Sequence, residues 1–202
     1  MGMTDLAVLL PYIVFCIVMT GTPGPNNAMA LAAGVKVGFW RSMPLVAGIA
    51  VGVAVQLVMI GLGLGAAFEA VPLLHDLLRV AGAAYLLWLA WKIARSGPLR
   101  SDGGERPPLG FLGGAVFQWI NPKAWAITTS AVAAYVPAAD FRLNIAIAAL
   151  VMVLVSVPCV SVWAAGGTVL RRFLFQPRYA RIFNVTVALL LVATTVSILL
   201  DA

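Results

Sequence analysis

Apolar residues occur in six long runs along the chain, separated by short polar segments. The runs cover residues 6–20, 43–68, 72–91, 110–135, 143–169 and 182–200, and the first continues through an interrupted part to about residue 29. A helix of about 20 apolar residues spans the hydrocarbon core of a bilayer. The runs lack the alternation of apolar and polar residues that marks the strands of an outer-membrane barrel. The pattern therefore predicts an all-α polytopic membrane protein with six transmembrane helices.

Composition supports a bilayer as the solvent of this chain. Of its 202 residues, 62% are apolar and 10% are charged, whereas a soluble domain carries about a quarter charged residues. A cleaved signal peptide is the alternative for the first run, because residues 28–30 resemble a cleavage site. No basic residue precedes that run, however, and further apolar runs follow it. We therefore expect the first run to remain in the protein as a membrane span.

The basic residues fall mainly on one side of the predicted membrane. Ten of the thirteen follow the first, third or fifth run: Lys36, Arg41, Lys92, Arg95, Arg100, Arg106, Arg171, Arg172, Arg178 and Arg181. Loops rich in Lys and Arg are retained in the cytoplasm. We therefore expect these three loops to be cytoplasmic and both termini to lie outside. The net charge of +6 thus indicates membrane topology and not a nucleic-acid partner.

One polar segment, RSGPLRSDGGERPP, divides the chain into two halves with three runs each. We interpret residues 95–109 as a cytoplasmic linker between a first three-helix repeat (1–94) and a second (110–202). Because three is odd, the second half enters the membrane from the opposite side. If the halves share a fold, they form an inverted repeat, a common plan among secondary transporters. The halves show no convincing residue-level similarity to each other.

Each half interrupts its first apolar run with proline beside asparagine. The first run contains TPGPNN (residues 22–27), and the fourth contains QWINPKAW (residues 118–125). Proline removes a backbone donor and displaces the carbonyl four residues earlier, and free backbone groups at membrane depth are tolerated only against protein or a wet cavity. Matched interruptions in two halves indicate a transport site. A simple proline kink, repaired by neighbouring side chains, is the alternative. The predicted substrate-binding residues are Pro23, Gly24, Pro25, Asn26, Asn27, Gln118, Asn121, Pro122 and Lys123.

Lys123 lies inside the fourth run, near its middle. A lysine at the centre of a membrane helix costs about 2.5–3.5 kcal/mol on insertion scales, and all acidic residues fall in loops or at the ends of runs. Lys123 is therefore predicted to bind a substrate carboxylate or to titrate during transport, with snorkelling to an interface as the alternative. The amides of Asn26, Asn27, Gln118 and Asn121 are suited either to a zwitterion or to the freed backbone groups.

Two further sets of polar residues have packing as their simpler explanation. Gln56 shares a helix face with Gly48 and Gly52, and small residues at this spacing allow close helix contact. We favour packing with one interhelical hydrogen bond for Gln56 over substrate contact. Asp76 and Arg79 can pair at the outer end of the third run; an interfacial helix end is the simpler interpretation, and an outer gate is the alternative.

Four motifs together resemble the LysE/RhtB family of amino-acid exporters. They are PGPN at residues 23–26, GIAVG at 48–52, RVAGAAYLLWLAWK at 79–92 and NPK at 121–123, and they occur in the family's order. The resemblance implies a six-helix transporter that exports amino acids or related small metabolites across the bacterial inner membrane. It implies neither enzymatic activity nor a cofactor, and its partners are a small-molecule substrate and the lipid bilayer.

Other functional classes find less support in the residues. A membrane enzyme needs a cluster of His, Asp or Glu, but the chain has one His, and its acids are scattered. Neither Cys16 nor Cys159 has the neighbours of a metal site, and no Gly-Lys-Ser/Thr loop for ATP is present. A non-transporting membrane subunit with a structural or assembly role is the main alternative. The sequence leaves open the substrate, the coupling ion, the direction of net flux and assembly into a homo-oligomer.

Overall fold

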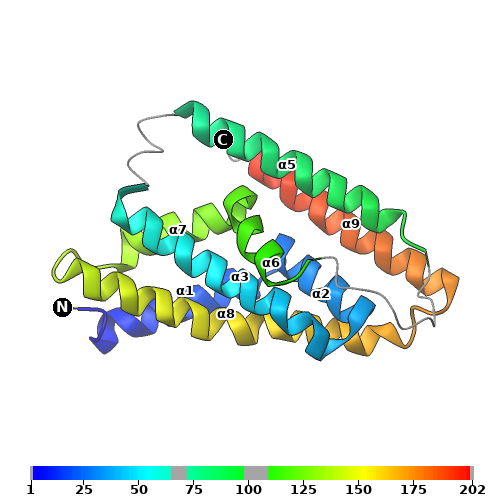
Figure 1. The fold of residues 1–202 in the computed structure, drawn as a ribbon, viewed down its shortest axis with the longest axis horizontal. Helices are drawn as coiled ribbons and strands as arrows, with labels where there is room; N and C mark the ends of the chain where they lie inside the picture. The colour runs from blue at the N-terminus through cyan, green and yellow to red at the C-terminus, as the bar shows by residue number, and fades with distance from the viewer. Residues whose placement is uncertain (1, 65–71, 98–108, 201–202) are drawn as a thin grey trace.

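A computed structural model describes residues 2–64, 72–97 and 109–200, and all elements in these residues are helical (Figure 1). The first half contains α1 (Leu6–Gly21), α2 (Pro25–Val37), α3 (Phe39–Met59), the π-helical turn η1 (Ile60–Leu64) and α5 (Pro72–Ala94). The second half contains α6 (Phe111–Phe117), the 3₁₀ turn η2 (Gln118–Ile120), α7 (Pro122–Tyr135), α8 (Phe141–Arg171) and α9 (Pro177–Leu200). The all-α prediction is confirmed. Most of the predicted linker, residues 98–108, lies outside the described residues.

Helix α2 is the main difference from the predicted elements. The first run was expected to end near residue 29, but α2 continues to Val37 and is buried along most of its length. Apart from Met29 and Leu31 its apolar residues are Ala and Val, and it also contains two Asn and a Lys, so in the sequence it lacks the strongly apolar character of a membrane span. Because protein and not lipid surrounds α2, it does not need large apolar side chains. Gly38 then turns the chain into α3 at φ 83°, a backbone conformation that favours glycine.

Length and composition identify fewer membrane spans than the six predicted from the sequence. Within the described residues, three helical segments are long and apolar enough to cross a bilayer: Phe39–Leu64, Phe141–Arg171 and Pro177–Val196. Helices α1 and α2, bent by 57° at their junction, count as a fourth if the pair is one span. The break at Asn121 divides the fourth run into two short helices. In α5, the segment Val80–Ala94 is apolar but shorter than a span.

Helix α8 is the central packing element of the molecule. It packs against α1, α2 and α3, while α6 packs on α3 and α5 pairs with α9 (Figure 1). Glycines allow the closest contacts: a Cβ at Gly34 would meet the backbone of Ala164, and a Cβ at Gly167 would meet the backbone of Leu31. Backbones can approach this closely only where side chains are small.

The buried apolar residues form two clusters, and the two broken helices cross from one to the other. One cluster includes Tyr12 from α1 and Ile127 from α7. The other includes Ala30 from α2 and Phe117 from α6. Because each broken helix contributes to one cluster before its break and to the other after it, both breaks lie at the boundary between the clusters.

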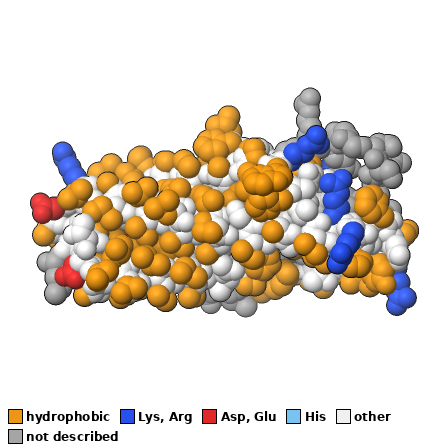
Figure 2. All heavy atoms as spheres, turned by 90° about the horizontal axis from the view of Figure 1, so that it is seen from below, with side chains coloured by type: hydrophobic (Ala, Val, Ile, Leu, Met, Phe, Trp, Pro, Cys, Tyr) orange, Lys and Arg blue, Asp and Glu red, His pale blue; other side chains and the backbone are white. Residues whose placement is uncertain are grey.

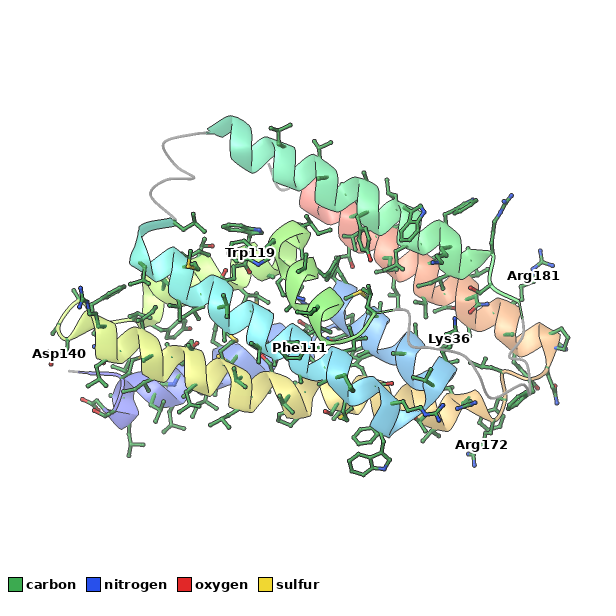
Figure 3. The ribbon with its side chains drawn as sticks, in the orientation of Figure 1. Lys36, Phe111, Trp119, Asp140, Arg172 and Arg181 are labelled. Carbon is green, nitrogen blue, oxygen red and sulfur yellow. The ribbon has the colours of Figure 1, made fainter. Side chains whose placement is uncertain are left out.

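The outer surface is apolar along its length and charged at its ends. Leu112 is 75% exposed and Val162 is 70% exposed, and Figure 2 shows hydrophobic side chains over most of the visible face. Lys and Arg gather mainly at one end, with acidic side chains at the other (Figure 2). Lys36, Arg172 and Arg181 lie at the basic end, opposite Asp140 (Figure 3). This distribution fits a protein embedded in a bilayer with its charged ends in water.

Candidate functional site

The first break separates α1 from α2 at residues 22–24. Thr22 and Gly24 adopt extended backbone conformations, and Pro25 occupies the first turn of α2. Asn27 then folds back onto the break: its Nδ2 donates to the carbonyl oxygens of Thr20 at 2.9 Å and of Thr22 at 2.6 Å. One amide thus satisfies two carbonyls that the end of α1 leaves without helical partners.

The second break is at Asn121, between η2 and α7. Asn121 is extended (φ −91°, ψ 103°), and Pro122 begins α7. The preceding turn tightens to a 3₁₀ helix, which commonly marks the end of an α-helix. Gln118 and Asn121 are both buried, at 0% and 1% exposed. Polar amides therefore occupy the interior at this point of the chain.

The structure brings the two breaks together, although more than 90 residues separate them along the chain. Asn26 Nδ2 donates to Gln118 Oε1 at 2.9 Å, and Gln118 Nε2 donates back to Asn26 Oδ1 at 3.0 Å. Asn121 Nδ2 also donates to Asn26 Oδ1, at 3.3 Å. These bonds form one polar network between the halves of the molecule.

Lys123 reaches from α7 across to the first break. Its Nζ donates to the carbonyl of Thr22 at 3.1 Å, to Thr22 Oγ1 at 2.9 Å and to the carbonyl of Pro23 at 3.1 Å. The three N–H donors of an ammonium group are thus all used. Gly24 makes room for the side chain, because a Cβ there would lie 2.9 Å from Lys123 Cδ. The charge sits at the carbonyl end of α1, where a cation is favourable.

Sequence reasoning did not foresee this bridging role. The predictions for Lys123 were contact with a substrate carboxylate, titration during transport, or snorkelling to an interface. In this conformation the ammonium binds backbone and hydroxyl oxygens of the other half. A substrate carboxylate can therefore reach Lys123 only by adding to these bonds or replacing one of them.

A small polar cavity lies at the junction of the two breaks. It has a volume of about 20 Å³, which is enough for one water molecule. Its polar lining comprises Thr20, Asn26, Asn27, Asn121, Lys123 and Ser156. Ser156 belongs to α8 and was not among the predicted site residues; the signals in the sequence are a hydroxyl group in a mainly apolar segment and Pro158 two residues later.

A second, much larger cavity of about 670 Å³ lies between α2, α3, α5 and α9. Its wall includes Lys36 and Lys92 together with the aromatic rings of Tyr85, Trp88 and Phe183. Because Lys36 lies in its wall, this cavity is at the basic end of the molecule (Figure 3). The two cavities share no lining residue, but Met29 in the large one is one helical turn from Asn26 in the small one. No motif in the sequence indicates the larger cavity.

Of the remaining predicted residues, Gln56 contacts the second break, and Asp76 and Arg79 have side chains that the structure does not describe. Gln56 Nε2 donates to the carbonyl of Gln118 at 3.2 Å, an interhelical bond like the one that the packing interpretation describes. On the same face of α3, a Cβ at Gly48 would meet the backbone of Phe111. Asp76 and Arg79 belong to α5, but their side chains lie outside the described part of the structure.

No metal centre is present in the part of the chain that the structure describes. Within residues 2–64, 72–97 and 109–200, no three His, Cys, Asp or Glu side chains gather in a metal-binding arrangement. Cys16 is buried and Cys159 is partly buried, and both are free thiols. The chemistry that the site offers is therefore hydrogen bonding together with one positive charge.

Comparison with known proteins relates the whole chain to membrane exporters. Residues 17–202 match the family model described as LysE type translocator. The cysteine/O-acetylserine efflux protein of Escherichia coli (strain K12) is 33% identical over 186 residues, which cover 91% of this chain and 93% of that protein. The proteins of the same name from Shigella flexneri and Escherichia coli O9:H4 (strain HS) match equally. No solved structure matches the chain.

Proposed function

The chain belongs to the family of LysE-type translocators, and on that premise we propose that it is a secondary transporter that exports small amino acids across the bacterial inner membrane. The named relatives are efflux proteins for cysteine and O-acetylserine. We propose substrates of the same class for this chain: small, uncharged side chains on an α-amino acid backbone.

The observation that carries this proposal is the meeting of the two helix breaks. A polar network of Asn26, Gln118 and Asn121 lies where two apolar clusters adjoin. Beside it, Lys123 bonds the first break at Thr22. Polar groups inside a membrane protein are costly and mark substrate or ion pathways. We therefore propose that substrate is held at the breaks formed by residues 23–27 and 118–123.

Helix pairing supports an inverted repeat of two three-helix units. In the proposed scheme, residues 1–94 and 110–202 form the repeats, residues 95–109 link them, and the broken first and fourth helices each make one of six spans. Under that relation α3 corresponds to α8 and α5 to α9, and both of these pairs are in contact. The same relation pairs α1 with α6. Helix α1 of the first half packs on α8 of the second, and α6 of the second half packs on α3 of the first, so the two contacts are equivalent.

Charge distribution and the cavities support access from the cytoplasm in this conformation. Under the positive-inside rule the basic end, with its three Lys- and Arg-rich loops, faces the cytoplasm and both termini lie outside. The large cavity lies at that basic end. Toward the opposite end, the ring centroid of Tyr135 lies 5.6 Å from that of Tyr12 and 5.1 Å from that of Phe15. Tyr12 Oη also donates a hydrogen bond to the carbonyl of Ala148. Rocking of the halves about the breaks would open that side and close the basic end.

Efflux from vesicles containing the purified protein tests this proposal. Vesicles are loaded with cysteine, O-acetylserine, or larger, acidic or basic amino acids, and efflux is followed with and without an imposed pH gradient. We expect efflux of the small neutral substrates above that of protein-free vesicles. Absence of efflux for every amino acid under every gradient would instead favour a non-transporting membrane subunit with a structural or assembly role.

Substrate protection at the breaks tests where the substrate binds. Asn26→Cys, in a background without Cys16 and Cys159, is reacted with a small thiol reagent in the presence of an exported amino acid. We expect the substrate to slow the reaction at residue 26 and to leave unchanged the reaction at an Ala139→Cys control, which is exposed before α8. Equal rates with and without substrate at residue 26 would place the binding site elsewhere.

A further inference from the structure

Three buried oxygen atoms around the small cavity have no hydrogen-bond partner among the described residues. They are Asn27 Oδ1, Asn121 Oδ1 and Ser156 Oγ. The three residues are 3%, 1% and 1% exposed. Burying a polar atom without a partner is unfavourable, and natural proteins leave few such atoms. Three in one place indicate that a ligand completes the site.

The hydrogen bonds of the two amides fix which atom of each is the oxygen that lacks a partner. Asn27 Nδ2 donates to the carbonyls of Thr20 and Thr22, so exchanging its nitrogen and oxygen would set an oxygen against two carbonyl oxygens. Asn121 Nδ2 donates to Asn26 Oδ1 and to Gln118 Oε1, both at 3.3 Å. In each case the nitrogen has acceptors and the oxygen lacks a donor.

Ser156 differs from the other buried hydroxyl groups in the membrane helices. Thr128 and Thr195 each donate to the carbonyl four residues earlier at 2.8 Å, the usual arrangement of a hydroxyl inside a helix. Ser156 makes no such bond and lines the small cavity instead. Its hydroxyl oxygen therefore joins the amide oxygens of Asn27 and Asn121 at the same cavity, and the three come from α2, the second break and α8.

The charge beside the cavity selects among ligands that need oxygen acceptors. Lys123 also lines it, and its ammonium would repel a bare metal ion. Among the described residues that line the cavity, such an ion would find only three side-chain oxygens that lack partners. An α-ammonium group has three N–H donors for three acceptors, and it arrives with a carboxylate that offsets its charge. The volume of about 20 Å³ suits the ammonium group alone, so the rest of the molecule requires the helices at the breaks to separate.

We propose that Asn27 Oδ1, Asn121 Oδ1 and Ser156 Oγ form the binding site for the α-ammonium group of the exported amino acid. This inference rests on the proposed function. It assigns the oxygens at the breaks to the positive end of the zwitterion and leaves Lys123 for its carboxylate. It also assigns a substrate contact to α8, whose Ser156 lines the cavity between the two breaks.

The first test compares substrates on the unaltered protein. Efflux of O-acetylserine is measured beside that of its N-acetylated form and of the analogue in which hydrogen replaces the amino group. We expect both analogues to be exported at least a hundredfold less efficiently, because neither supplies the three donors. Efflux of the analogues at rates equal to O-acetylserine would overturn the ammonium site while leaving the exporter intact; absence of efflux for O-acetylserine and every other amino acid would overturn the proposed function itself.

The second test removes one oxygen. Ser156→Ala is expected to raise the KM for O-acetylserine about tenfold, equivalent to about 1.4 kcal/mol, at an unchanged protein level. Ser161→Ala is the matched control: Ser161 lies on the same helix and is partly buried, but its hydroxyl contacts Met43 Sδ at 3.8 Å and not the cavity. Equal KM values for the two variants would overturn the assignment. Loss of efflux on replacing Na⁺ with choline would also overturn it, since the cavity would then belong to a metal ion.

Discussion

Lys123 links the two helix breaks through its side chain. Its ammonium is held by three oxygens of the first break, so the positive charge is compensated without a carboxylate. The same three bonds tie the start of α7 to the end of α1. Any motion that separates the two breaks must therefore exchange these bonds for others, and a substrate carboxylate is a suitable acceptor.

Replacing Lys123 with Met is expected to reduce export more than tenfold, because the substrate loses its cation and the oxygens of Thr22 and Pro23 lose their donor. The free energy of unfolding of the purified protein in detergent should also fall by about 1–3 kcal/mol. Arg142→Met, an exposed position at the start of α8, serves as the control and should match the unaltered protein. Full export by the Lys123 variant at normal protein level would contradict the proposed role.

At the scale of helices, close backbone contact holds α2 against α8. The face of α2 that contains Gly34 approaches the backbone of Ala164, and Gly167 of α8 approaches that of Leu31. Such contacts replace the hydrophobic effect, which contributes little between helices already surrounded by lipid. Because α2 begins at the first break and contains Asn26 and Asn27, this packing also positions the site.

Two neighbouring glycines of α8 give opposite predictions for the same substitution. Gly167→Ala would set a Cβ against the backbone of Leu31 and 2.9 Å from the amide nitrogen of Val35, and we expect it to destabilise the protein by about 1–3 kcal/mol. At Gly166 the nearest atom to an added Cβ is Leu31 Cδ1 at 3.8 Å. Gly166→Ala should therefore be neutral or stabilising by up to about 1 kcal/mol. The unfolding temperatures of both variants, measured in one detergent, distinguish the two predictions. Equal changes in unfolding temperature would mean that α2 and α8 adjust to the added methyl group without loss of stability.

At the scale of the whole molecule, charge orients the protein and the breaks divide it. The basic end and the acidic end are separated by an apolar surface (Figure 2). Both broken helices pass from one buried cluster to the other at the site. In the proposed transport cycle, this polar boundary between the two clusters is where the halves move against each other.

Labelling of single cysteines is expected to show the orientation directly. In a protein without Cys16 and Cys159, Ala139→Cys, exposed before α8, should react with a membrane-impermeant maleimide added to intact cells. Gln176→Cys, exposed in the basic loop before α9, should react only after the cells are permeabilised. The reverse pattern would invert the topology, and labelling of both from outside would contradict the alternation of spans.

The sequence by itself determined the features that depend on solvent and on local chemistry. A bilayer requires long apolar helices, so the runs are visible as composition, and their ends agree closely with the observed α5, α8 and α9. Proline acts on its own neighbours, so both breaks were found at the correct residues. The positions of Lys123 and of the amides followed from the same motifs, as did the resemblance to the family, which the comparisons confirmed.

Only the tertiary structure decided which atoms of these residues face one another. Asn26 pairs with Gln118 across 92 positions in the sequence, and Ser156 lines the same cavity from α8, which continues through Pro158 without a break. Such contacts depend on how each helix is rotated and where it crosses its neighbours. Both are set by packing of Gly34, Gly48 and Gly167 against distant backbones, and no local pattern encodes the partner of a glycine.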